Sequence, residues 1–196
     1  MMIPMTPDVE AILAELDGHR LRFTVLCRSL TSEELDRPVP QSTWIVRDFI
    51  AHLATIDGPV GGMFRTIHEG GDAGIRGNDG APWDVDRWNE VQVQQRRALT
   101  VDQLLFEAAE QRTALRNQLA RLTEDDLDRI IKFGGDARRP PSEIALRSYL
   151  RGWCKHDVMH AVDMARAFPE KISARTAEWF ADPVVAMYQK SMNGPA

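Results

Sequence analysis

The chain has 196 residues, of which 43% are hydrophobic and 27% are charged, and this composition is typical of a globular domain with a sizeable core. Its net charge of −5 argues against nucleic acid or an anionic membrane surface as the main partner. The sequence shows no apolar run of about 18 residues and no signal-peptide pattern, so we expect a cytoplasmic protein.

The first predicted helix covers residues 7–30, where apolar residues recur at three- and four-residue intervals. We expect Leu21 and Val25 to belong to its buried stripe. Residues 31–35 carry hydroxyl and acidic side chains that favour a short helical turn, and a proline-containing connection follows.

The second predicted helix begins near Trp44 and carries an apolar stripe that includes Phe49 and Ile56. Glycine and proline residues at 58–62 predict an interruption, after which the helix resumes. The glycine-rich stretch 69–82 has no apolar period, and we expect it to be a surface loop.

A polar helix is predicted over 84–99, and a capping box at Thr100 begins a third long helix that runs to residue 122. A glycine- and proline-containing connection then leads to Ser142, which is expected to cap a fourth long helix. That helix carries two closely spaced histidines. A terminal helix is predicted over 171–189.

A short internal sequence repeat suggests that the two halves of the chain have the same arrangement of helices. The segment LTSEELDR at 30–37 resembles LTEDDLDR at 122–129, and each leads to a histidine-bearing helix. This repeat is consistent with two helical hairpins packed as a bundle. Because no segment shows sustained strand alternation, we predict an all-α fold in one domain that covers residues 1–196.

Three of the five histidines lie in apolar, helix-like surroundings. His156 and His160 are four residues apart and share one helix face, and His52 lies in a similar setting far upstream. Three imidazoles can hold one divalent metal ion and leave a position open. The alternative is that they are ordinary hydrogen-bonded histidines. The spacing matches a zinc-protease motif, but Asp157 stands where that motif has glutamate.

Several neighbours are candidates to support such a site. A histidine that binds metal usually donates its other ring N–H to an acceptor that orients the ring. The nearby carboxylates that could act as such acceptors are Asp48, Asp163 and Asp157. For Asp157 we favour an ordinary surface charge. Three tryptophans could line an apolar pocket, with core packing as the alternative for each, and they are Trp44, Trp88 and Trp153.

The remaining histidines and the cysteines have weaker functional signals. His19 lies between polar neighbours and His68 precedes the glycine-rich stretch, so we expect both on the surface. Cys27 and Cys154 belong to no CxxC motif and are too few for a disulfide framework. We expect both to be reduced and packed as small hydrophobic residues.

The chain resembles the DinB-like superfamily, and within it the N-terminal domain of mycothiol-dependent maleylpyruvate isomerases. The residues that carry the resemblance are WIVRDFIAHL at 44–53, DRWNE at 86–90 and HDVMHAVDMA at 156–165. The resemblance implies an antiparallel four-helix bundle with extra short helices. It also implies a divalent metal on three histidines, which by position are His52, His156 and His160.

The same resemblance implies a metal-dependent transferase or isomerase that uses a thiol such as mycothiol or bacillithiol on a small-molecule substrate. The metal would be zinc, or alternatively nickel or iron. Relatives of this shape often pair, so a homodimer is also expected. Two alternatives remain, a metal-dependent hydrolase and a non-catalytic stress or scaffold protein. An open set of three ligands favours an enzyme, because closed structural zinc sites normally have four.

Overall fold

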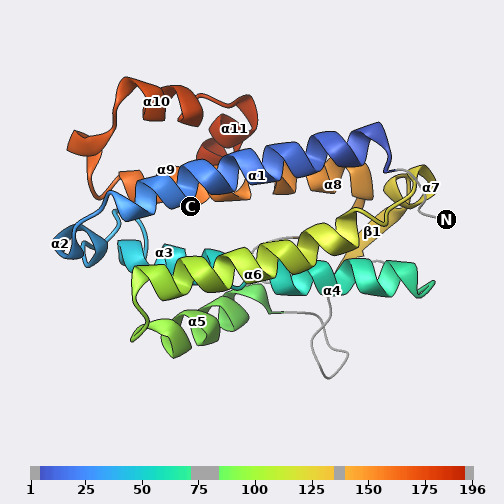
Figure 1. Ribbon diagram of the computed structural model, residues 1–196, viewed down its shortest axis with the longest axis horizontal. Helices are drawn as coiled ribbons and strands as arrows, with labels where there is room; N and C mark the ends of the chain where they lie inside the picture. Colours follow the sequence, from blue (N-terminus) through green and yellow to red (C-terminus); the bar gives the residue numbers. More distant parts are fainter. Residues whose placement is uncertain (1–4, 72–83, 135–139, 193–196) are drawn as a thin grey trace.

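The computed structural model describes residues 5–71, 84–134 and 140–192, and it confirms the predicted helical bundle (Figure 1). The elements of the first half of the chain are α1 (Pro7–Arg28), α2 (Ser32–Leu35), α3 (Val46–Leu53), α4 (Asp57–His68) and α5 (Val85–Arg96). Those of the second half are α6 (Val101–Leu119), α7 (Glu124–Leu127), β1 (Ile130–Phe133), β2 (Ser142–Ala145), α8 (Leu146–Trp153), α9 (His156–Ala165), the 3-10 turn η1 (Pro169–Lys171), α10 (Ala174–Phe180) and α11 (Pro183–Met192).

Four long rods form the bundle. Two of them are single helices, α1 and α6, and the other two are broken helices made of α3 with α4 and of α8 with α9 (Figure 1). Helix α6 packs on α1, α3 and α4, and α9 packs on α1 and α3. The short helix α5 covers α3, whereas α10 and α11 cover α9. No helix in the described ranges is long and apolar enough to cross a membrane.

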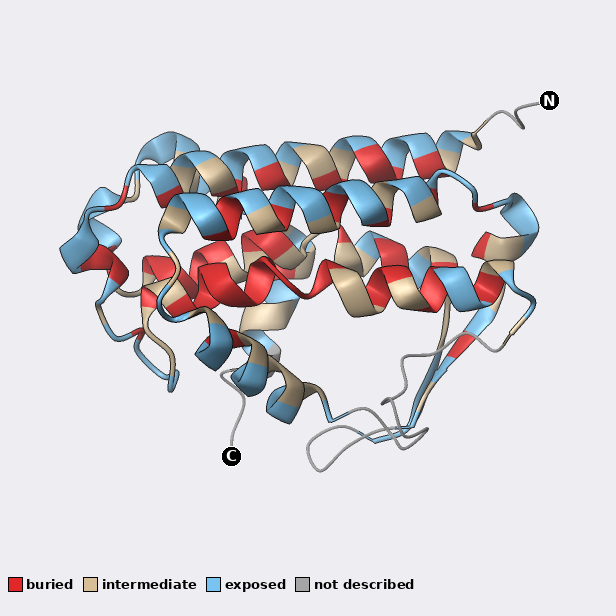
Figure 2. Cartoon of the chain, turned by 60° about the horizontal axis from the view of Figure 1, so that its bottom comes forward, coloured by how far each residue is buried: buried red, intermediate tan, exposed pale blue. Residues whose placement is uncertain are grey.

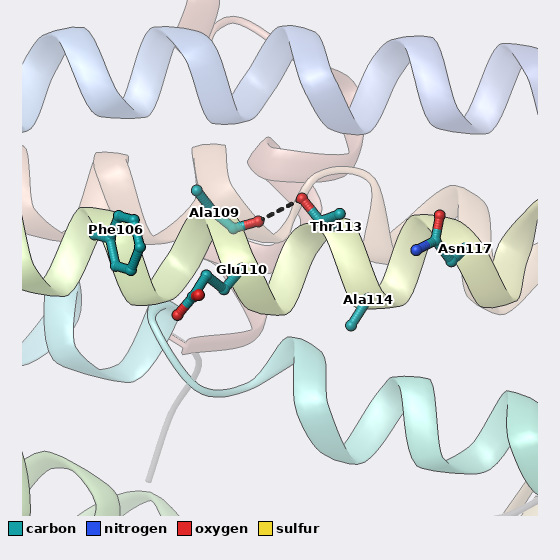
Figure 3. Close-up of a pocket in the computed structure, with 6 residues that line it drawn as sticks. All are labelled: Phe106, Ala109, Glu110, Thr113, Ala114 and Asn117. Carbon is teal, nitrogen blue, oxygen red and sulfur yellow. Dashed lines mark hydrogen bonds between the residues drawn. The ribbon is translucent and has the colours of Figure 1, made fainter.

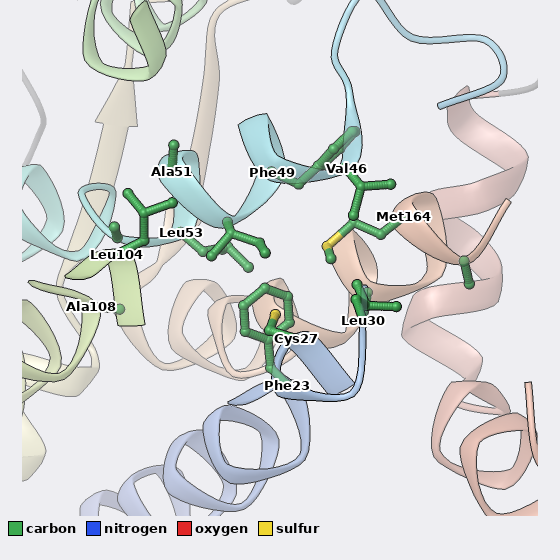
Figure 4. Close-up of a cluster of buried hydrophobic side chains, with 14 of the residues drawn as sticks. Phe23, Cys27, Leu30, Val46, Phe49, Ala51, Leu53, Leu104, Ala108 and Met164 are labelled. Carbon is green, nitrogen blue, oxygen red and sulfur yellow. The ribbon is translucent and has the colours of Figure 1, made fainter. Parts of the chain in front are cut away.

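The long helices turn their buried residues inward and their exposed residues outward (Figure 2). One buried cluster lies around α3 and α9 and includes Phe23, Phe49, Leu53 and Met164 (Figure 4). A second cluster lies between α1, α4, α6 and α8. Burial of these apolar side chains supplies the main driving force for folding, and the first cluster supports the site described below.

The internal sequence repeat is matched by a repeat in the structure. Thr31 with Glu34 and Thr123 with Asp126 form matching capping boxes at the start of α2 and α7. The backbone amide of Val46 donates to Arg37, and that of Leu146 donates in the same way to Arg129. Each half of the chain therefore repeats one order, in which a long helix, a short helix, an extended crossing and a broken helix follow one another.

The predicted start of the fourth long helix was wrong. Ser142 does not cap a helix but begins β2, which pairs antiparallel with β1, and α8 begins only at Leu146. The two prolines that precede β2 favour an extended backbone. Pairing with β1 then uses backbone N–H and C=O groups of β2 in hydrogen bonds between strands, so these groups are not available for a helical turn. The all-α bundle thus carries one small sheet at the crossing.

Three further details differ from the sequence prediction. Leu21 and Val25 are 66% and 63% exposed, because Arg20 and Phe23 occupy the buried face of α1 instead. The second helix breaks at residues 54–56, before the glycine- and proline-rich stretch, and Pro59 lies in the first turn of α4, where a missing N–H is tolerated. The terminal helix is divided into α10 and α11. Most of the predicted loop, residues 72–82, lies outside the described ranges.

Candidate metal centre

Three histidines from two helices meet inside the bundle. His52 lies near the end of α3, His156 is the first residue of α9 and His160 follows one turn later. One ligand atom from each lies within 4.8 Å of the other two. The Nε2 atoms of His156 and His160 are 3.1 Å apart, which suits two nitrogens that share one ion at about 2.1 Å each. The structure therefore brings together the three predicted ligands.

Aromatic side chains enclose this cluster. Trp153 stacks on the ring of His156 with ring centres 4.4 Å apart, and Trp44 lies 5.4 Å from His52. Both tryptophans, which were predicted to line a pocket, thus lie beside the histidine rings. Trp88, the third predicted lining residue, is half-buried against the neighbouring core cluster. These walls limit the access of water to the histidines and strengthen electrostatic interactions there.

Burial lowers the pKa of His52 and of His156 well below 6.5, and the nearby His160 lowers both pKa values further. The charged form of a buried imidazole is disfavoured because it loses its hydration. Both rings are therefore neutral at pH 7, which is the form that binds metal. The donor set fits a divalent metal ion such as zinc, because imidazole binds metal in its neutral form and so leaves the charge of the ion intact.

The metal-free protein is expected to lose stability as the pH falls from about 7.5 to about 5.5. The folded pKa values of His52 and His156 are below 6.5, so the unfolded chain binds protons first as the pH falls. Each histidine can cost the folded state up to about 1.4 kcal/mol per pH unit below its unfolded pKa. Thermal unfolding in a chelator tests this, and a Tm that does not change with pH would contradict it.

Asp163, a predicted supporting residue, lies beside His160. Its Oδ2 atom lies 3.3 Å from Nδ1 of His160, which leaves Nε2 of that ring directed at His156. The hydroxyl of Tyr188 donates to the same oxygen at 3.0 Å, and Arg166 pairs with the other carboxylate oxygen. Sequence reasoning missed Tyr188, because it lies on α11 and no local pattern links that helix to the histidines.

Asp48 was wrongly predicted to support His52. Its carboxylate accepts a hydrogen bond from the backbone amide of Ile45 at 3.2 Å and pairs with Arg97 at 3.5 Å. Asp48 thus satisfies a free amide at the beginning of α3, which matters because Ile45 has no hydroxyl with which to cap the helix. Its role is to begin the helix that carries His52.

Asp157 was wrongly predicted to be a surface charge. Only 2% of it is exposed, and it accepts two hydrogen bonds from Arg20, at 2.8 and 3.0 Å, and two from Arg112, at 3.3 Å. Arg112 also donates to Asp57 at 2.7 Å. These four residues, which we call the charge cluster, join α1, α4, α6 and α9 in the interior of the bundle. Asp157 directly follows His156, so the cluster fixes the start of α9.

The other two histidines are less exposed than predicted. His19 accepts a hydrogen bond from Nε1 of Trp179 at 2.8 Å, and its side chain is only 12% exposed. Nε2 of His68 lies 3.1 Å from the backbone oxygen of Gln118. Each of these two histidine rings thus makes a hydrogen-bonding contact between two helices, and neither belongs to the three-histidine cluster.

Both cysteines are buried and reduced, as predicted. Burial raises the pKa of Cys154 to about 12, and its Sγ atom faces the backbone oxygen of Ile12. Burial raises the pKa of Cys27 even further. Because the thiolate is the reactive form, neither residue is a suitable nucleophile near neutral pH.

A surface hollow lies on α6, and none of the three histidines lines it (Figure 3). All of its lining residues come from this one helix, and they are Phe106, Ala109, Glu110, Thr113, Ala114 and Asn117. The hydroxyl of Thr113 is already used, since it donates to the backbone oxygen of Ala109 at 2.8 Å. One helix face without convergent polar groups does not form a binding site.

Comparisons with known proteins agree with the fold described above. Two solved structures, the mycothiol-dependent maleylpyruvate isomerase and a histidine-to-alanine mutant of it, match the fold with TM-scores of 0.60 and 0.61. Their sequences are 14% and 13% identical to this chain, and each match covers 83% of this chain and 63% of the isomerase. No curated protein gave a significant match. The DinB superfamily profile matches residues 15–164, and the chain therefore belongs to the DinB superfamily.

Proposed function

We propose that this chain binds a divalent metal ion through His52, His156 and His160 and catalyses the transfer of a low-molecular-weight thiol to a small electrophilic substrate, or an isomerisation that uses such a thiol. The observation that carries the proposal is the convergence of three imidazoles, two of them held neutral by burial, with no fourth His, Cys, Asp or Glu in the cluster among the described residues. Open sites of this kind are typical of catalytic rather than structural metals.

A divalent ion in this site would lower the pKa of a bound thiol and so supply a nucleophile at neutral pH. In a transfer, the sulfur would form a bond to an electrophilic carbon while the bond from that carbon to the displaced group breaks, and the thiol proton would go to that group or to solvent. In an isomerisation, the thiol would add across a double bond of the substrate and be released again, so that the thiol is regenerated. The chain itself holds the three imidazoles, and Asp163 orients His160. Trp44 and Trp153 form apolar walls for the bound molecule.

Two features support an external thiol. The protein's own cysteines are buried and have raised pKa values, so they do not compete as nucleophiles. The isomerase that shares this fold is named for its dependence on mycothiol. The choice between mycothiol and bacillithiol, the choice among zinc, nickel and iron, and a homodimeric assembly remain predictions.

The test is elemental analysis of the purified protein, followed by thiol-conjugation assays with mycothiol or bacillithiol and a panel of electrophiles. We expect about one divalent ion per chain and thiol consumption that stops when a chelator removes the ion. Ester or amide hydrolysis without thiol consumption would instead support a metal-dependent hydrolase. A protein that binds no divalent metal would contradict the proposal and favour a non-catalytic role.

A further inference from the structure

Two buried polar atoms on helices α3 and α5, which pack together, have no hydrogen-bond partner within standard geometry. They are Nδ1 of His52, on α3, and Oδ1 of Asn89, on α5. Leaving a buried polar atom unpaired costs about 1–3 kcal/mol, so two such atoms in one place call for a physical explanation. A small adjustment that pairs the two atoms with each other, an ordered water or a ligand would remove this cost.

The two atoms belong to side chains that approach each other. Helix α5, which carries Asn89, packs on α3, which carries His52, and the side chain of Asn89 acts on the His52 ring. Burial lowers the pKa of His52, and the contact with Asn89 acts in the opposite direction. An amide oxygen accepts a hydrogen bond and a neutral imidazole can donate one, so each atom can satisfy the other.

We propose that Asn89 is a positioning residue whose Oδ1 accepts a hydrogen bond from Nδ1–H of His52. This bond fixes the neutral ring in the tautomer that carries its proton on Nδ1 and leaves Nε2 free to bind the metal. The inference rests on the proposed metal site. It assigns to Asn89 the role that was predicted for Asp48, whose carboxylate is instead used by Ile45 and Arg97.

Helices α9 and α3 then orient their histidine rings with different hydrogen-bond acceptors. His160 on α9 faces a carboxylate, that of Asp163, which also binds Tyr188 and Arg166. His52 is only 3% exposed and lies in more apolar surroundings. A neutral amide orients it there without adding a charge that would itself have to be desolvated.

The first test compares zinc affinities by competition with a chromophoric chelator. Asn89→Leu keeps the side-chain size but removes the acceptor, and we expect zinc binding to weaken by about 10- to 100-fold. Asn89→Asp restores an acceptor and should bind within a few-fold of the wild-type protein. The matched control is Asn117→Leu, which removes an amide from the outer side of α6 and should leave zinc affinity unchanged.

The second test needs no metal and no folded variant. Nitrogen-15 NMR of the metal-free wild-type protein is expected to show His52 protonated on Nδ1, with that proton in a hydrogen bond. A ring protonated on Nε2 would overturn the proposal, as would wild-type zinc affinity in a folded Asn89→Leu protein. If the wild type binds no zinc, the proposed function fails, while the NMR result still decides whether Asn89 orients His52.

Discussion

Replacing His156 with alanine is expected to remove the metal and the thiol-transfer activity together, whereas Cys154→Ala is expected to keep both. His156 is one of the three proposed ligands among the described residues, so its loss leaves two imidazoles and should weaken metal binding by at least about 100-fold. Cys154 has a pKa of about 12 and faces a backbone oxygen, so it contributes packing rather than a nucleophile. Its replacement should cost about 1 kcal/mol of stability.

The comparison uses two residues of the same bundle interior that are close in sequence, Cys154 buried and His156 partly buried, so each variant is a control for the other. Metal content and turnover are measured on both variants, with a thiol and an electrophile that the wild type converts. Circular dichroism establishes that both variants are folded. If a folded, metal-loaded Cys154→Ala protein lost turnover, the external thiol would not be the nucleophile, and the proposed mechanism would have to be abandoned.

The histidine site could be predicted because its signals are local. A spacing of four residues places His156 and His160 on one helix face whatever the rest of the chain does. The capping box at Thr100 is equally local and was confirmed by the hydrogen bonds between Thr100 and Gln103. His52 is different, because no local pattern relates α3 to α9. Its apolar, helix-like setting made it a candidate third ligand, and the family resemblance implied the same residue.

The supporting residues were harder to predict, because their roles depend on distant partners. Asp157 resembles any helix-surface carboxylate in sequence, yet its partner Arg20 lies on another helix, and the sequence gives no sign of that pairing. Asp48 is three residues from Ile45, but its capping role was hidden because Ile45 lacks the usual hydroxyl. Asn89 carries no charge and so was not considered as a partner for His52.

The small sheet was missed for a related reason. The segment that forms β2 begins with serine and glutamate, which at this position also fit the start of a helix. The deciding contact is the antiparallel pairing with β1, which lies across a connection and leaves no periodic pattern in four residues. The first half of the chain makes the same crossing with a single bridge between Pro38 and Ile45, so the duplicated layout was the better guide.

The charge cluster links this duplication to the site. Arg20 on α1 and Arg112 on α6 occupy corresponding places in the two halves, as do Asp57 and Asp157 at the start of α4 and α9. Each arginine contacts both aspartates, so the two positive and two negative charges balance in the interior. Such a cluster fixes four helices relative to one another. Because His156 directly precedes Asp157, the cluster also fixes the position of His156.

Arg112→Met is expected to destabilise the metal-free protein by about 3–5 kcal/mol, because it leaves two buried carboxylates with a single arginine. The matched control is Arg116→Met, one turn along the same helix, where the pair with Asp17 is 42% exposed on both sides and contributes less than about 1 kcal/mol. Urea unfolding of both variants measures the difference. Arg20→Met should resemble Arg112→Met, since the two arginines occupy corresponding places. Equal, small effects at positions 112 and 116 would show that the charge cluster does not stabilise the bundle.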